Sequence, residues 1–179
     1  MVKTFLALAM MFASSNALRM ALAPWSRRDV LSGVGLSVGG LAALPTPASA
    51  AVGSCKKGAN NCVEGTWTGA KDAKDAAATL KSVLDAYPQA GQDGVDGGGW
   101  KYISSSDSEF KLEYNSAGTG NLAKFFNGGK PFTDDLDISI NADGSVNFKS
   151  ASRVGDSDFG VNGKRMTYIA NALKAKGWN

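Results

Sequence analysis

The segment from Lys149 to Arg165 gathers hydroxyls, two arginines, carboxylates and an asparagine where an alternating apolar pattern gives way to a helical one. The backbone N–H groups at the start of a helix, supplemented by arginine side chains, bind anionic groups. The sequence therefore predicts a ligand or anion site here. Its candidate residues are Ser150, Ser152, Arg153, Asp158, Asn162 and Arg165, with Asp135 from an earlier segment.

A structural role for the same residues stays open. Asp158 or Asn162 can cap the helix that follows. Gly155 and Gly160 suit a tight turn. In this interpretation Arg153 and Asp158 bond to each other or to the helix start, and they fix the joint between strand and helix.

Catalytic residues are not assigned. The chain contains no histidine, so its serines lack the usual general base. Asp134 and Asp135 are adjacent, and adjacent residues on a strand point to opposite faces of the sheet, which is poor geometry for acid–base chemistry. We expect no cofactor, and we lean against enzymatic activity while leaving it open.

Cys55 and Cys62 are the two cysteines of the chain. In an exported domain two cysteines by default form a disulfide, which in the chain-entropy model stabilises this short loop by about 2–2.5 kcal/mol. A regulatory thiol pair is the alternative. A metal site is not expected, because zinc needs additional cysteine or histidine ligands.

A group of large apolar residues is placed among glycine-rich stretches. On a loop, such residues contact a membrane surface or a protein partner. In the alternative, they fold back and close one end of a small core. The candidate partner-contact residues are Leu122, Phe125, Phe126 and Phe132.

The N-terminal region has the layout of three consecutive targeting segments. Residues 1–17 are predicted to be a signal peptide, and residues 18–26 a short transit segment. Residues 27–50 open with Arg27-Arg28 and end in a small-residue cleavage site, as in a twin-arginine export signal. This order resembles lumenal proteins of algae with secondary red plastids. It predicts the plastid thylakoid lumen, with the bacterial periplasm as the alternative.

The formal net charge of +3 arises in this predicted leader, which contains four basic residues and one acidic residue, Asp29. The basic residues are Lys3, Arg19, Arg27 and Arg28. The rest of the chain is balanced in charge, which argues against a nucleic-acid-binding surface. It contains no apolar stretch of ~18 residues, so no transmembrane anchor is expected after cleavage. The expected partner is a thylakoid membrane protein complex.

Two helices and four strands are predicted in the domain at residues 51–179. Apolar residues recur at helical spacing from Ala70 to Pro88 and from Gly163 to Lys176. Residues 51–69 contain glycines and both cysteines, and we expect them to be irregular. Alternating segments occur at Trp100–Ser104, Phe110–Tyr114, Leu136–Ile140 and from Val146 towards Val154, with a hairpin turn at Asn141–Gly144.

These patterns predict the α+β class. The simplest arrangement that buries every apolar stripe is a four-stranded antiparallel sheet with two helices packed on one face, in a single small domain.

The C-terminal segment resembles a signature of domain-of-unknown-function family 1499. The shared residues are Ser150-Ala151-Ser152-Arg153-Val154-Gly155, then Ser157-Asp158-Phe159-Gly160-Val161-Asn162 and Arg165. Asn61-Cys62-Val63 and Phe132-Thr133-Asp134-Asp135 are similar to two further family segments. The resemblance covers almost the whole domain. The family has no agreed activity, so the resemblance implies a fold and a compartment but no reaction.

Three functions remain open. The preferred one is a soluble, photosynthesis-associated accessory protein that binds a thylakoid complex or membrane surface. The second is a carrier that holds a lipid, pigment or small anion between sheet and helices, which an apolar cavity would favour. The third is a hydrolase-type enzyme, which a deep cleft centred on Asp135, Arg153 and Asp158 would favour.

Overall fold

The computed structural model describes residues 51–118 and 125–179. The predicted leader at 1–50 and the candidate contact residue Leu122 therefore lie outside the described residues. The elements follow in the order β1 (Cys62–Trp67), α1 (Ala73–Asp85), β2 (Trp100–Ser105), β3 (Glu109–Asn115), β4 (Thr133–Ile140), β5 (Val146–Ser152) and α3 (Val161–Lys174).

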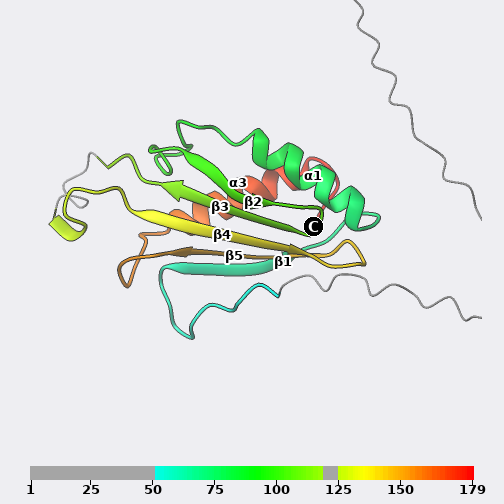
Figure 1. The fold of residues 1–179 in the computed structure, drawn as a ribbon, viewed down its shortest axis with the longest axis horizontal. Coiled ribbons are helices and arrows are strands. Elements are labelled where there is room, and N and C mark those ends of the chain that lie inside the picture. Colours follow the sequence, from blue (N-terminus) through cyan, green and yellow to red (C-terminus); the bar gives the residue numbers. More distant parts are fainter. Residues whose placement is uncertain (1–50, 119–124) are drawn as a thin grey trace, which may run out of the picture. The chain divides into compact units, whose positions relative to one another are not determined.

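The strands of the described part form one antiparallel sheet of five strands in the order β1-β5-β4-β3-β2. In Figure 1, β1 and β2 are its two edges and both helices lie on the same side. The α+β class and the two helices are confirmed. The prediction of four strands was wrong, because β1 lies in the segment expected to be irregular.

Strand β1 depends on its neighbour β5 more than on its own sequence. Gly65 would ordinarily weaken a strand. Here the ring of Phe148 covers it so closely that an added Cβ would lie 2.8 Å from Cζ of that ring. Trp67 then stacks on the same ring, with the centroids 4.1 Å apart. A glycine-containing strand is stable because an aromatic residue distant in sequence fills the space over it.

Helix α1 begins at the cap Asp72, whose carboxylate accepts a hydrogen bond from the Asp75 N–H. Its buried residues form the predicted stripe on one face. The helix ends at Asp85, before Pro88, as the missing proline N–H requires. It packs against the sheet and α3 through Ala76, Ala77, Leu80, Val83 and Leu84.

Helix α3 buries Met166, Ile169 and Leu173. The chain turns away after it at Gly177, where φ is +90°, a conformation that glycine adopts without strain. Trp178 then folds back and is buried in the core. Within residues 51–118 and 125–179, no helix has the length and apolar character needed to cross a bilayer.

The two faces of the sheet differ as the alternation predicts. The covered face carries Phe110, Leu112 and their neighbours in a single core. On the opposite face, charges alternate in sign across four strands, because Lys111 pairs in register with Asp137, Asp137 with Lys149, and Lys149 with Glu64. Such cross-strand pairs stabilise a sheet face that neither α1 nor α3 covers.

Candidate functional site

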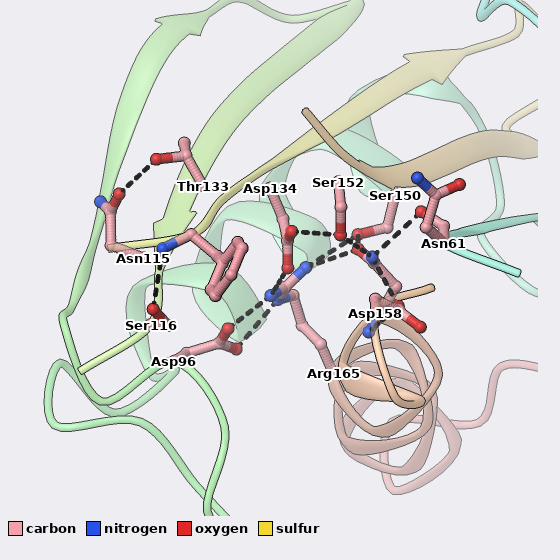
Figure 2. A network of polar contacts seen from close by, with 12 residues as sticks. Asn61, Asp96, Asn115, Ser116, Thr133, Asp134, Ser150, Ser152, Asp158 and Arg165 are labelled. Carbon is pink, nitrogen blue, oxygen red and sulfur yellow. Dashed lines mark hydrogen bonds and ion pairs between the residues drawn. The ribbon is translucent and has the colours of Figure 1, made fainter. Parts of the chain in front are cut away.

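Arg165 of α3 lies fully buried at the centre of a polar network at one end of the sheet (Figure 2). Its Nε donates to Asp96 at 2.9 Å, and one terminal nitrogen donates to Asp96 and, at 2.7 Å, to Asp134. The other terminal nitrogen donates to Ser150 at 2.9 Å and to Asn162 at 2.8 Å. A guanidinium has five N–H donors, so every donor of Arg165 already has a partner.

The surroundings keep Arg165 charged. Burial opposes the charge, but hydrogen bonds and ion pairs with Asp96 and Asp134 outweigh burial and raise the pKa of Arg165 above its ordinary value. The guanidinium carbon also lies 4.3 Å from the ring centroid of Tyr114, a cation–π contact. A buried charge without such partners would strongly destabilise the fold.

A second set of hydrogen bonds joins β5 to the start of α3. Ser152 donates to Asp134 at 2.5 Å and accepts from the Asn162 amide at 3.1 Å. Asp158 accepts from the backbone N–H groups of Gly160 and Asn162 at 2.9 and 2.8 Å. The N-cap residue of α3 is Gly160, and not Asp158 or Asn162 as predicted. The Asp158 side chain nevertheless binds the free N–H of Asn162 in the first turn.

The residues before β1 also bond to the segment that joins β5 to α3. The Asn61 carbonyl accepts from the Ser152 N–H at 2.9 Å, and the Asn61 side chain donates to the Gly155 carbonyl at 2.5 Å. The predicted disulfide between Cys55 and Cys62 is confirmed. It closes the short loop that contains Asn61, so the disulfide and the 152–158 segment are mechanically connected.

Asp96 comes from the glycine-rich connector at 91–99, where φ of this residue is +60°. A residue other than glycine rarely adopts this conformation, and the surrounding structure must stabilise it. Arg165 does so, together with the Tyr87 hydroxyl, which donates to Asp96 at 2.5 Å. Burial and the Asp96 carboxylate raise the pKa of Tyr87, so that hydroxyl keeps its proton.

A cavity of about 700 Å³ lies beside the network. Its walls are the connector at 90–97, residues 116–118 and the joint at 152–161, and its polar residues include Asp96, Asp134, Ser152 and Asp158. Its apolar side chains include Val95, Phe132, Val154, Phe159 and Val161. The cavity thus combines an apolar wall with a polar base.

The structure brings five of the predicted site residues into one network and separates two from it. The five are Ser150, Ser152, Asp158, Asn162 and Arg165. Arg153 instead forms a two-point ion pair with Asp135, at 2.6 and 2.9 Å, and a further bond to Glu113 at 2.8 Å.

Of the two expected arrangements, the bond between Arg153 and Asp158 is not formed, whereas Asp158 does bond to the start of the helix. Neighbouring strand residues face opposite ways, so Ser152 faces the network while Arg153 faces the charged side of the sheet. For the same reason Asp134 joins Arg165 and Asp135 joins Arg153. Asp135, Arg153 and Asp158 consequently do not share one cleft.

Glu113 completes the ion pairs on the charged face. It lies 3.0 Å from the Lys101 ammonium and 2.8 Å from the Arg153 guanidinium. The hydrogen bond from Lys101 has the largest effect and lowers the pKa of Glu113. Burial opposes it, and the hydrogen bond from Arg153 lowers the pKa further. The partners of Arg153 are therefore not among the residues that line the cavity.

Sequence reasoning missed Asp96, Asp134 and Tyr114 as parts of the site. Asp134 carried one usable signal, since alternation placed it on the face opposite Asp135. For Asp96, the sequence offered one weak signal, an acidic residue within a glycine-rich connector. The Tyr114 hydroxyl is, among the described residues, the buried side-chain polar atom without a hydrogen-bond partner.

The predicted partner-contact residues fall into two groups. Phe125 and Phe126 are 83% and 63% exposed and meet edge to face, with centroids 5.0 Å apart. Phe132 is only partly exposed and lines the cavity. Of these aromatic residues, Phe125 and Phe126 are therefore accessible to a partner, whereas Phe132 belongs to the cavity lining.

Comparison with protein families gives a match. The family model described as "Protein of unknown function (DUF1499)" matches residues 52–173. The matched span includes the disulfide, all five strands and every residue of the Arg165 network. No curated protein matches the chain.

Proposed function

We propose that this chain, which belongs to the DUF1499 family of proteins of unknown function, binds and carries a small amphipathic ligand in the cavity beside Arg165. The observation that supports this proposal is the cavity itself. Its volume of about 700 Å³ falls within the roughly 300–1,000 Å³ of typical ligand pockets. Such pockets pair an apolar wall with a few fixed polar groups, and this arrangement is present here.

The position of the cavity differs from the one expected for a carrier. The space between sheet and helices is filled by a solid core, in which Leu80, Leu136 and Ile169 have no exposed surface. The cavity lies instead among the segments at one end of the sheet. A small anion is a poor candidate ligand, because Arg165 has no free donor and Arg153 lies on the other face.

Phe159 supplies a second argument for binding. It lines the cavity, is 77% exposed and has a φ of +54°. For a residue with a side chain this conformation costs about 1–2 kcal/mol. Packing of the Phe159 ring does not explain this positive φ, because the ring is largely in solvent. Strained residues of this kind cluster at ligand-binding sites.

The test is a fluorescence titration of the purified full chain with the neutral apolar dye N-phenyl-1-naphthylamine. We expect saturable binding that Val154→Asp weakens at least tenfold, because a charge would then line the apolar wall. Ile103→Asp is the matched control, since Ile103 and Val154 are both exposed apolar residues, at 54% and 44%, and only Val154 lines the cavity. Unsaturable binding, or equal loss in both variants, would contradict the proposal.

The accessory-protein function is supported by a separate observation, the exposed Phe125–Phe126 pair. Two adjacent aromatic rings in solvent mark a contact with a protein or membrane surface. A variant with both residues changed to serine should lose co-sedimentation with thylakoid membranes and retain dye binding. The lumenal address of this accessory protein rests on the leader sequence.

A further inference from the structure

The charges around the cavity are unbalanced. Four carboxylates line it, from Asp93, Asp96, Asp134 and Asp158, and no lysine or arginine is among its described lining residues. Arg165, behind the lining, neutralises part of this charge. The Lys164 ammonium approaches Asp93 to only 3.9 Å, and both side chains are more than half exposed, so solvent weakens that pair.

The polar base offers hydrogen-bond acceptors and few donors. The donors of Arg165 are all used, and the Ser152 hydroxyl already donates to Asp134. Each carboxylate oxygen can accept about two hydrogen bonds. Each oxygen of Asp134 accepts one bond from within the network, from Ser152 or from Arg165, which leaves capacity for a ligand donor.

The apolar wall indicates which chemical group the rest of the ligand should carry. Val154 and Val161 can cover an aliphatic or ring-shaped body, and Phe132 and Phe159 add two aromatic rings to the lining. Aromatic faces also attract cations. The wall therefore suits an apolar body and tolerates a positive charge at its border.

We infer that the cavity takes a cationic amphiphile, an amine on an apolar body, with its nitrogen against Asp134 and Asp96 and its apolar part along Val154 and Phe159. This inference rests on the proposed carrier function and specifies the ligand of that same site. An N–H-bearing cation satisfies the spare acceptors and balances the excess negative charge. A carboxylate or phosphate ligand would meet like charges at this base, where the donors of Arg165 and Ser152 are already used.

The experiment compares octylammonium, octanol and octanoate, which share one chain and differ in the head group. Isothermal titration of the full chain near pH 7 should give at least tenfold tighter binding for octylammonium than for octanol, with octanoate weakest. Equal binding of all three, or tightest binding of octanoate, would overturn the inference and leave the carrier intact. If none binds and the neutral dye also fails, both proposals are wrong.

Two variants test the charge argument without touching the buried network. Asp93→Asn removes an exposed lining carboxylate, and we expect it to reduce the preference for octylammonium over octanoate about twofold to fivefold. Val154→Lys places a cation on the wall and should reverse the preference, whereas Ile103→Lys, outside the cavity, should leave it unchanged. An unchanged preference in Val154→Lys, or an equal change in Ile103→Lys, would overturn the inference.

Discussion

Arg165 organises the site at the scale of single residues. It connects the 91–99 connector through Asp96, strand β4 through Asp134 and strand β5 through Ser150. Because Arg165 is buried, each of these bonds contributes to the stability of the fold, since an unpaired charge in the interior is destabilising. Arg153, close to it in sequence, is exposed on the opposite face and has no such role.

Changing Arg165 to methionine should therefore destabilise the protein by about 3–5 kcal/mol, because two buried carboxylates lose their common partner. Arg153→Ala should cost less than about 1 kcal/mol, because its ion pairs are exposed to solvent. Urea unfolding followed by circular dichroism gives both free energies. Adding Asp96→Asn and Asp134→Asn to Arg165→Met should recover part of the loss. Equal losses in the two arginine variants would contradict this assignment.

Phe159 allows a test that separates stability from binding. Glycine relieves the positive φ, so Phe159→Gly should leave the free energy of unfolding unchanged or raise it by up to about 1 kcal/mol. The same change removes an aromatic ring from the cavity wall and should weaken dye binding several-fold. Thermal melts and dye titration on one preparation decide this. A clear loss of stability would mean that the ring has a packing role.

At the scale of elements, the strand–helix joint at 152–161 depends on the segment before β1. The N–H groups of Ser152 and Asp158 donate to the carbonyls of Asn61 and Asn60, at 2.9 and 3.4 Å. The disulfide restrains that segment from its other side. Since residues 152–158 form part of the cavity wall, the disulfide contributes to the shape of the cavity as well as to stability.

Replacing both cysteines with serine should lower the free energy of unfolding by about 2–2.5 kcal/mol. Native-state hydrogen exchange should accelerate more at the amides of Ser152 and Asp158 than at the amide of Leu112 in β3, which reports the global loss of stability. Dye affinity should fall in parallel. Uniform acceleration at all three amides would indicate a global effect, and would contradict a specific connection between disulfide and cavity wall.

At the scale of the whole molecule, the predicted leader and the domain support different parts of the proposal. The proposed lumenal location rests on residues 1–50, which lie outside the described part of the structure. The proposed ligand chemistry rests on the domain alone. A carrier that reaches its compartment by a twin-arginine route crosses the last membrane already folded, so the buried network would form before that step.

Mass spectrometry of the native protein should find a mature chain that begins at or near Ala51. Changing Arg27 and Arg28 to lysine should stop the last translocation step and cause a longer precursor to accumulate outside the lumen. Changing Lys3 instead is the control for a general loss of import. A mature protein that retains Arg27-Arg28 would contradict the lumenal location.

The sequence by itself determined the elements whose patterns are local. Alternation located β2, β3, β4 and β5, helical spacing located α1 and α3, and the presence of two cysteines in a domain predicted to be exported gave the disulfide. Asp158 was also recognisable as a side chain that bonds to the start of α3, because such bonds join a side chain to backbone groups a few residues away. In each case the controlling contacts lie within about one turn or one strand.

Only the tertiary structure decided the rest. Strand β1 exists because Phe148, far along the chain, covers Gly65. Asp96 belongs to the site because Arg165, 69 residues away, requires a carboxylate at that place once it is buried. The cavity lies between segments that meet only after folding. A residue such as Asp96, which pairs with a distant buried charge, leaves no periodic signal in the sequence. Its position follows from packing and not from local backbone geometry.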